Sequence, residues 1–341
     1  MRLDEEPVRQ IAAVLRDPSK ALLVPTSGST GAPREVRLTG EALAASGNAT
    51  HAALSGPGSW LLATPIDRIA GIMVAVRSML AGTPLGHLPH GTFTGAGFAS
   101  YVEGWNTDGP RYVSLVPTQL HRVLESPAGR AALATFDAVL VGGAPLHRDA
   151  PSEVVTTYGS TETCGGCVYD GLPIGDTQFR LVDGRVWLSG PTLALGYVDG
   201  DDSAFVTDDG VRWFVTSDIG EVDEDGRLRI LGRADHVINT GGVKVHPVAV
   251  ERALESLPYV DAAIVVGLPD PEWGARAVAL VETASGIPQW RLVREALRSD
   301  LPAPAIPRDG WAVETLPTLA SGKIDRSAAQ ELAAKLALED R

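Results

Sequence analysis

The 341-residue sequence has only two cysteines and no long apolar run. Two cysteines cannot form the disulfide framework of a secreted domain, so we expect a reducing, cytoplasmic location. The longest apolar stretch, AGIMVAV, stops at Arg77 and is too short to cross a bilayer. The acidic run DEE at residues 4–6 stands near Met1, where a signal peptide would continue with apolar residues. These features predict a protein without membrane insertion.

Basic side chains are also scarce. The 29 lysines and arginines are outnumbered by 42 acidic residues, and the net charge of -13 argues against charge-driven binding to nucleic acid or to an acidic membrane. Cys164 and Cys167 in CGGC supply only half of the four ligands that a structural zinc ion needs, and the sequence has no second pair. We interpret this pair as incidental, with a redox or zinc role as the alternative.

Several apolar runs rich in Val, Leu and Ala end in turns of glycine or hydroxyl residues. They are ALLVPTSGSTG, RYVSLVPTQ, FDAVLVGGAP and EVVTTYGSTE. Continuous apolar runs favour strands that are buried on both faces, as in the parallel sheet of an α/β protein. Ligands of such sheets bind beyond the carboxyl ends of the strands. We therefore expect the four turns to face one site.

The later part of the chain has a different pattern of apolar and polar residues. From Leu172 to Ile230, short alternating segments separated by Gly and Asp predict antiparallel hairpins or a distorted barrel. After Gly232, a helix, two strands and a further helix predict a small α+β module. The expected fold class is α/β. It comprises a large N-terminal domain, residues 1–233, with mixed or parallel sheets and a distorted β-barrel-like element, and a small C-terminal domain, residues 234–341.

The segment TSGSTGAPRE, residues 26–35, allows two interpretations. Glycine and serine are common turn residues, so it could be a plain surface loop. Its backbone N–H groups and hydroxyls could instead hold a polyphosphate. It lacks the lysine spacing of the G-x-x-x-x-G-K-[ST] loop of nucleoside triphosphatases. Taken alone, the segment leaves both interpretations open.

Five motifs in order resemble those of the acyl-adenylate-forming superfamily, which includes acyl-CoA synthetases, luciferases and peptide-synthetase adenylation domains. They are TSGSTGAPRE at 26–35, YGSTE at 158–162, TSD at 216–218, GRADHVINTGGVKV at 232–245 and PTLASGKIDR at 317–326. The resemblance implies two half-reactions. A carboxylate attacks the α-phosphate of ATP to give acyl-AMP and pyrophosphate, and a thiol, usually coenzyme A, then displaces AMP. The resemblance also implies a C-terminal domain that moves between the half-reactions.

The resemblance assigns roles to residues of the first half-reaction. The β- and γ-phosphates would be held by Thr26, Ser27, Gly28, Ser29, Thr30 and Gly31. Adenine and ribose would be contacted by Gly142, Gly143, Ala144, Tyr158, Asp218 and Arg233. Thr161 would donate to the α-phosphate or the acyl carboxylate, and Glu162 would hold Mg²⁺, which prefers carboxylate and phosphate oxygens. Lys323 would be catalytic, because its cation offsets the repulsion between two approaching anions.

The second half-reaction uses a different set of residues in this family. Asp235 falls at the hinge position. A loop containing Gly241, Gly242 and Lys244 would take the place of Lys323 and let the pantetheine arm pass close to the backbone. The implied small molecules are a carboxylic acid, ATP and coenzyme A, with Mg²⁺. The oligomeric state stays open, and a homodimer is one option.

Within this family, VSLVPTQLHRVL at 113–124 and the short region ahead of the phosphate motif resemble the short actinobacterial o-succinylbenzoate-CoA ligases of menaquinone biosynthesis. That acid has an aromatic carboxylate that is not activated, and a buried carboxylate needs a cation or several donors. We expect Arg68 in TPIDRIAG to supply the cation, whereas a contact with Asp67 or a surface position is the alternative.

Two other functions remain open at this stage. The chain could be another acyl- or aryl-CoA synthetase, acting on a different acid. It could also be a catalytically silent acyl-adenylate-binding protein, because Arg34 and Glu35 stand where relatives have Lys-Gly. Retention of Glu162, Asp218 and Lys323 argues against a silent protein.

Overall fold

The structure, a computed structural model, describes residues 5–26, 34–89, 91–143, 150–284, 286–319 and 324–340. The described chain divides into two compact units. The large unit holds the described residues of Met1–Leu146 together with Ala150–Thr216 and Val222–Leu228. The small unit holds Ser217–Glu221 and the described residues of Arg229–Arg341. The domain boundary after residue 233 stays a prediction.

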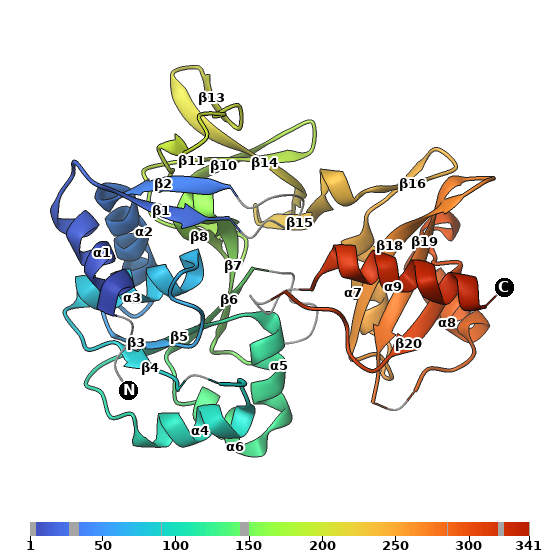
Figure 1. Cartoon of the computed structure of the whole chain (residues 1–341), viewed down its shortest axis with the longest axis horizontal. Coiled ribbons are helices and arrows are strands. Elements are labelled where there is room, and N and C mark those ends of the chain that lie inside the picture. Colours follow the sequence, from blue (N-terminus) through green and yellow to red (C-terminus); the bar gives the residue numbers. More distant parts are fainter. Residues whose placement is uncertain are drawn as a thin grey trace. The chain divides into compact units, whose positions relative to one another are not determined.

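A seven-stranded sheet forms the centre of the large unit (Figure 1). Its order is β4, β3, β5, β6, β7, β8, β9. The first five strands are mutually parallel, β8 is antiparallel to β7, and β9 is antiparallel to β8. The bounds are β3 (Ser59–Leu62), β4 (Gly86–His87), β5 (Arg111–Leu115), β6 (Ala138–Gly142), β7 (Val154–Ser160), β8 (Gly165–Tyr169) and β9 (Leu172–Pro173). The α/β fold class is therefore confirmed.

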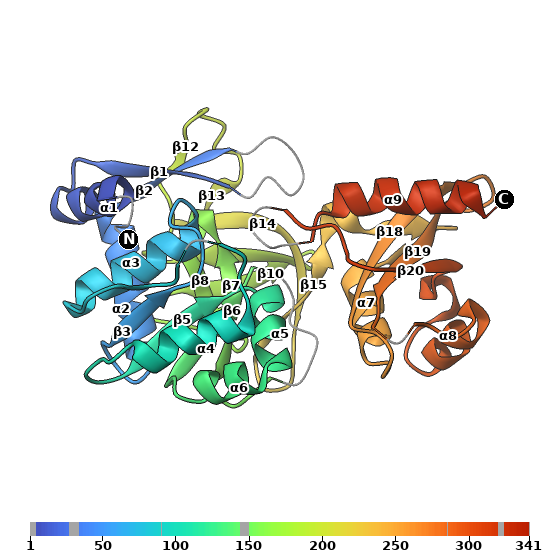
Figure 2. The ribbon, with the colours of Figure 1, turned by 60° about the horizontal axis from the view of Figure 1, so that its bottom comes forward.

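The central strands are covered on both faces, as their continuous apolar runs predict. Leu61, Val113 and Val139 point into a core with α4 (Gly95–Gly104), α5 (Pro117–Glu125) and α6 (Pro127–Leu133). Their neighbours Trp60 and Tyr112 point into a second core, which α2 (Gly40–Ala53) and α3 (Ile69–Ala81) help to close (Figure 2). This alternation is the two-residue period of a strand. The terminal helix α1 (Glu5–Arg16) packs on α2 and α3.

Two antiparallel sheets accompany the central sheet, and the five-stranded one contains residues of both units. β1 (Ala21–Pro25), β2 (Glu35–Thr39) and β12 (Gly196–Tyr197) form a three-stranded sheet. The expectation that the apolar run ALLVP is buried on both faces was wrong. It forms β1, whose Leu22 and Val24 point into the core while Leu23 is 51% exposed, because only one face of this sheet is covered. The five-stranded sheet has the order β10, β11, β14, β13, with β15 on β14. Its bounds are β10 (Gln178–Val182), β11 (Arg185–Ser189), β13 (Phe205–Asp208), β14 (Val211–Val222) and β15 (Leu228–Arg233). Among the described strands this sheet is open and does not close into a barrel.

Two tight turns explain why the hairpins form where they do. Asp183-Gly184 joins β10 to β11, and Asp209-Gly210 joins β13 to β14. All four residues have positive φ angles, between 49° and 76°. Two such residues in a two-residue loop match the right-handed twist of the flanking strands, and Asp-Gly is a favoured pair for this turn.

The small unit is the expected α+β module. Its strands are β16 (Ile238–Thr240), β17 (Val243–Val245), β18 (Ala262–Asp270), β19 (Gly274–Glu282) and β20 (Asp309–Val313). Helices α7 (Pro247–Glu255) and α8 (Trp290–Ala296) pack on one face of the sheet, through a core around Val265 and Ala279. Helix α9 (Arg326–Glu339) packs on the other face, through Ile264 and Ala329. No helix in the described ranges is long and apolar enough to span a bilayer.

A buried ion pair ties α9 to α7 in the small unit. Glu251 is 4% exposed, and both of its oxygens accept from Nη2 of Arg326, at 2.6 and 2.8 Å. Oε1 also accepts from the backbone N–H of Val265 at 2.9 Å, whose carbonyl accepts from Arg326 Nη1 at 3.0 Å. Burial raises the pKa of Glu251, although Arg326 opposes this effect. Arg326 therefore stabilises a charge that the core would otherwise disfavour.

We predict that Arg326→Ala lowers the free energy of unfolding of the small unit by about 3–5 kcal/mol at pH 7, because a buried charge loses its partner. Burial raises the folded-state pKa of Glu251, so this loss should shrink as the pH falls and the carboxyl group takes up a proton. Denaturant titrations at pH 7 and pH 5 measure the effect. Arg298→Ala, which breaks an exposed pair with Glu295, is the control. Equal losses in the two variants would contradict the prediction.

Candidate active site

Glu162 lies directly after the carboxyl end of β7, in a short 3₁₀ turn formed by Thr161–Thr163. The turn is fixed by Thr163, whose hydroxyl accepts from the backbone N–H of Ser160 at 2.9 Å. Thr161 and Glu162 are 7% and 8% exposed. The hydroxyl of Tyr197 donates to Oε1 of Glu162 at 2.8 Å. The sequence thus places a nearly buried carboxylate at the edge of the sheet where ligands are expected.

The surroundings of Glu162 fit a Mg²⁺ ion bound together with phosphate. Burial and the charge of Glu162 raise the pKa of Tyr197, so its hydroxyl stays a donor to the carboxylate. The described residues contain no cluster of three or more metal-ligating side chains. Mg²⁺ commonly uses one or two carboxylates and takes its other ligands from substrate phosphates and water. A single buried carboxylate is therefore sufficient for the predicted metal role.

The predicted nucleotide residues of the large unit lie on the two strands beside this turn. Gly142 ends β6 and pairs in register with Thr157 of β7, so that Gly142, Gly143 and Tyr158 lie at neighbouring strand ends. A Cβ atom on Gly142 would lie 2.3 Å from the Thr157 hydroxyl oxygen, so any side chain at this position would clash with β7. Ala144 lies outside the described residues. The adenine role of this group stays a prediction.

The ends of the predicted phosphate segment meet at the start of the β1–β2 hairpin. The backbone N–H of Thr26 donates to the Arg34 carbonyl at 2.7 Å, and the N–H of Arg34 donates to the Thr26 hydroxyl at 3.0 Å. The predicted phosphate residues Ser27, Gly28, Ser29, Thr30 and Gly31 lie outside the described residues. The side chain of Arg34 pairs with Asp199 and stacks on Tyr197.

Asp218 and Arg233, the predicted ribose contacts, lie in the small unit. Nη1 of Arg233 is 4.0 Å from Oδ1 of Asp218. The same guanidinium donates to both oxygens of Asp235, at 2.9 and 2.8 Å. Although burial would raise the pKa of Asp235, Arg233 holds it below the ordinary value. The predicted hinge carboxylate is therefore charged and paired with its neighbour, and the ribose and hinge roles stay predictions.

The predicted thiol-transfer loop is a tight hairpin between β16 and β17. Gly241 and Gly242 have φ angles of 58° and 83°, a conformation that glycine adopts without strain. The N–H of Gly241 donates to the carbonyl of Trp273 at 2.9 Å, and a Cβ atom on Gly241 would lie 2.3 Å from the Trp273 ring. Lys244 is exposed on β17. Lys323 lies outside the described residues, between Thr318 and Ile324, which form an antiparallel bridge.

Trp273 is a candidate that sequence reasoning missed. Its side chain is 37% exposed, which is unusual for the largest apolar residue, and it borders the glycine hairpin. The guanidinium carbon of Arg308 lies 5.1 Å from its ring centre. An exposed aromatic ring beside a cation can bind a flat or anionic ligand. The sequence signal was a tryptophan inside the turn DPEWG, between two apolar strands.

The structure places Arg68 at the start of α3, 41% exposed, with Nε 3.7 Å from Oδ2 of Asp67. This contact is the alternative that the sequence left open, and the substrate role of Arg68 stays a prediction. Arg77 on the same helix was treated only as the end of an apolar run. It is 4% exposed, its guanidinium carbon lies 4.9 Å from the Trp60 ring centre, and Nη2 donates to the hydroxyl of Tyr169 at 3.5 Å. Burial lowers the pKa of Arg77.

Residues 5–198 match the AMP-binding enzyme family, and residues 249–323 match the AMP-binding enzyme C-terminal domain. The chain therefore belongs to the AMP-binding enzyme family. This confirms the resemblance to acyl-adenylate-forming enzymes on which the motif assignments depend.

Two relatives and one solved structure show which kind of ligase the chain is similar to. The chain is 44% identical over 331 residues to a protein of Mycobacterium tuberculosis described as a probable 2-succinylbenzoate–CoA ligase, covering 92% of this chain and 84% of the relative. It is 29% identical to the 2-succinylbenzoate–CoA ligase of Enterococcus faecalis, covering 90% and 68%. The structure resembles the o-succinylbenzoate-CoA synthetase MenE of Bacillus subtilis in complex with the acyl-adenylate OSB-AMP. The TM-score is 0.75 and the identity 25%, over 90% of this chain and 68% of that one.

Proposed function

We propose that the protein is an acid–thiol ligase that converts o-succinylbenzoate to its coenzyme A thioester, through an acyl-adenylate and with Mg-ATP. The observation that carries this proposal is the nearly buried Glu162, held by Tyr197 at the edge of the central sheet, beside Gly142, Gly143 and Tyr158. The 44% identity to a probable 2-succinylbenzoate–CoA ligase supports the choice of acid. In this proposal the protein works in the cytoplasm, and a homodimer is the assembly to test.

In the first half-reaction, the large unit would orient Mg-ATP. Mg²⁺ offsets the negative charge of the phosphates when it is bound. Glu162 would hold the ion through its carboxylate, and the hydroxyl of Thr161, one residue earlier in the same turn, would donate to the α-phosphate or to the acyl carboxylate. Both residues are fixed by the turn before any ligand binds, so little reorganisation is needed as charge develops.

In the second half-reaction, the hairpin at Gly241 would accept the thiol substrate. The two glycines carry no side chains, so a narrow pantetheine arm could run along their backbone. Trp273 and Arg308 add an aromatic face and a cation next to this hairpin. Coenzyme A has an adenine ring and phosphates, which match those two kinds of group.

The second carboxylate of the acid needs a compensating charge, and two arginines of α3 are candidates. Arg68 is the N-cap residue of α3, just after the carboxyl end of β3, where a ligand of the sheet is expected, and its side chain is 41% exposed. Arg77 lies later on α3, which runs back toward the amino ends of the parallel strands β3 and β4. It is 4% exposed and donates to the hydroxyl of Tyr169 at 3.5 Å. These positions support Arg68 as the cation for the second carboxylate.

The direct test mixes the protein with Mg-ATP, coenzyme A and one acid, and detects thioester and AMP by mass spectrometry. We expect thioester from o-succinylbenzoate, and none at comparable rate from benzoate or a medium-chain fatty acid. Thioester from another acid would discard the substrate and keep the chemistry. Binding of ATP without AMP formation from any acid would instead favour a silent adenylate-binding protein.

A substrate analogue tests the role of Arg68. 4-Oxo-4-phenylbutanoate keeps the carboxylate that is activated and lacks the aromatic one. We predict that Arg68→Ala raises KM for o-succinylbenzoate about tenfold and leaves KM for the analogue within about twofold, since a charged hydrogen bond is lost only with the dianion. Arg130→Ala, at an exposed position of α6, is the control and should change KM for neither acid. An equal rise of KM for both acids in Arg68→Ala would contradict the prediction.

The glycine hairpin offers a second prediction. Gly241→Ala would drive a Cβ atom into the Trp273 ring, whereas Gly242→Ala has a similar positive φ and no atom within 4 Å of its Cβ. We expect Gly241→Ala to slow thioester formation from preformed acyl-adenylate about tenfold more than Gly242→Ala does, because only the first displaces the ring. Pyrophosphate release in the first half-reaction should be the same in both. Similar rates in the two variants would contradict a role for Trp273.

A further inference from the structure

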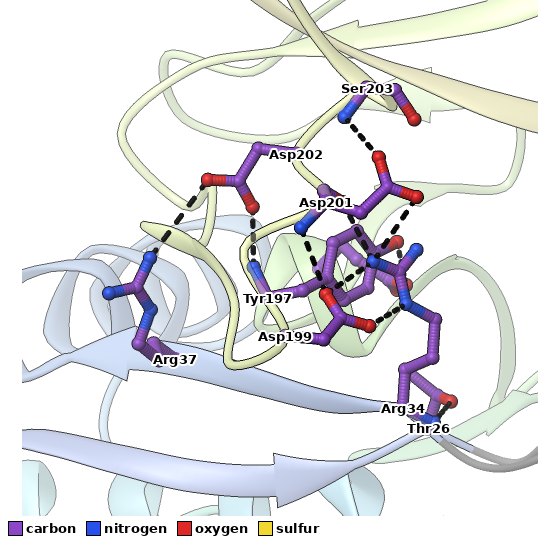
Figure 3. A network of polar contacts seen from close by, with 9 residues as sticks. Thr26, Arg34, Arg37, Tyr197, Asp199, Asp201, Asp202 and Ser203 are labelled. Atoms are coloured by element: carbon purple, nitrogen blue, oxygen red, sulfur yellow. Dashed lines mark hydrogen bonds and ion pairs between the residues drawn. The ribbon is translucent and has the colours of Figure 1, made fainter.

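The side chain of Arg34 is committed to a set of contacts on the turn after β12 (Figure 3). Nε donates to Oδ2 of Asp199 at 2.8 Å, and Nη2 donates to Oδ1 of the same residue at 2.7 Å. Nη2 also donates to the carbonyl of Asp201 at 2.7 Å. Hydrogen bonds from Arg34 hold the pKa of Asp199 below its ordinary value. The guanidinium thus lies in one fixed plane across this turn.

That plane lies on the ring of Tyr197. The guanidinium carbon of Arg34 is 3.5 Å from the ring centre, a close cation–π contact. Tyr197 is 5% exposed, and its backbone N–H donates to Oδ1 of Asp202 at 2.7 Å. At the far end of the ring, the hydroxyl donates to Glu162. A continuous set of contacts therefore runs from Asp199 through Arg34 and Tyr197 to the carboxylate that is expected to hold Mg²⁺.

This geometry requires arginine. Two parallel hydrogen bonds to a carboxylate and a flat face on an aromatic ring are both properties of the planar guanidinium, and the ammonium group of lysine has neither. The chain has arginine at position 34, whereas the family motif normally has lysine. The following Glu35 is exposed on β2 and carries no part of the network. The paired hydrogen bonds to Asp199 and the stacking on Tyr197 therefore explain why this chain has arginine where the family motif has lysine.

We propose that Arg34 is a positioning residue for Glu162, acting through the ring of Tyr197, and that it is not a ligand of the ATP phosphates. Asp199 fixes the guanidinium, the guanidinium fixes the ring, and the hydroxyl of the ring fixes one oxygen of Glu162. The other oxygen is thereby directed to the metal ion. This inference rests on the proposed Mg-ATP function.

The two roles of Arg34 predict different effects of the metal. A phosphate ligand contributes to ATP binding whether or not Mg²⁺ is present. A residue that positions Glu162 contributes only when the metal is present, because Glu162 contacts ATP through the ion. The informative quantity is therefore the ratio of the Kd for ATP with EDTA to the Kd for ATP with Mg²⁺.

The experiment is calorimetric titration of the full chain with ATP, once with Mg²⁺ and once with EDTA. We expect Arg34→Lys, Tyr197→Phe and Asp199→Asn each to raise the Kd for Mg-ATP about five- to tenfold and the Kd for metal-free ATP less than about twofold, because one charge-assisted hydrogen bond is lost. The double variant Arg34→Lys with Asp199→Asn should have the same Kd for Mg-ATP as either single variant, since each substitution breaks the same contact between Arg34 and Asp199.

Arg180→Lys is the matched control. Arg180 is 32% exposed, as Arg34 is, pairs with Asp208 and stacks on Trp187 and Trp213, all within the large unit. It should change neither Kd. The proposal is overturned if Arg34→Lys raises the Kd for Mg-ATP and the Kd for metal-free ATP by the same factor, or if Asp199→Asn leaves the Kd for Mg-ATP unchanged. It is also overturned if Arg180→Lys changes the two Kd values as Arg34→Lys does, or if Mg²⁺ does not change the Kd of the unaltered protein for ATP. No acid is present, so a wrong substrate would leave this test intact.

Discussion

The hydrogen bond from Tyr197 to Glu162 is the contact on which the candidate site depends. A carboxylate that is 8% exposed has little access to water, so donors or cations must satisfy its oxygens. The hydroxyl of Tyr197 compensates one oxygen, and burial with the adjacent negative charge raises the pKa of that tyrosine so that the donor is retained. In the proposed function, a divalent cation bound with phosphate would contact the other oxygen.

The architecture brings this carboxylate to the edge of the sheet where a nucleotide is expected to bind. Parallel β6 and β7 end side by side, so the glycines after one strand and Thr161 and Glu162 after the other share one edge of the sheet. Because β12 pairs with β2, Tyr197 on β12 and Asp199 in the turn after it lie next to the end of the phosphate segment. In the small unit, the pair of Glu251 and Arg326 holds α9 on the sheet directly after the segment that contains Lys323.

The sequence predicted the parts of the fold that depend on local patterns. Three of the four apolar runs are the central strands β5, β6 and β7, and Asp-Gly pairs gave the two tight hairpins, because both signals depend on neighbouring residues alone. The fourth run is β1 of an antiparallel sheet, because the sheet that a strand joins depends on its pairing partners. The order of the five motifs gave the family. The contacts of Arg34 could not be predicted in this way, since its partner Asp199 lies 165 positions later in the chain. Trp273 was missed because its exposure depends on the β18–β19 turn. Whether the antiparallel strands close into a barrel could not be predicted, because closure depends on pairing between strands that are distant in the sequence. Among the described strands, this sheet is open.

The central claim is that Glu162 holds the metal of bound Mg-ATP. It is tested most directly by diffraction from crystals soaked with Mn²⁺ and a non-hydrolysable ATP analogue, with the metal located by its anomalous signal. The account predicts a peak about 2.1 Å from the carboxylate of Glu162, the distance typical of Mg²⁺-like coordination, in contact with phosphate oxygens. A nucleotide-bound metal with no contact to Glu162 would contradict it.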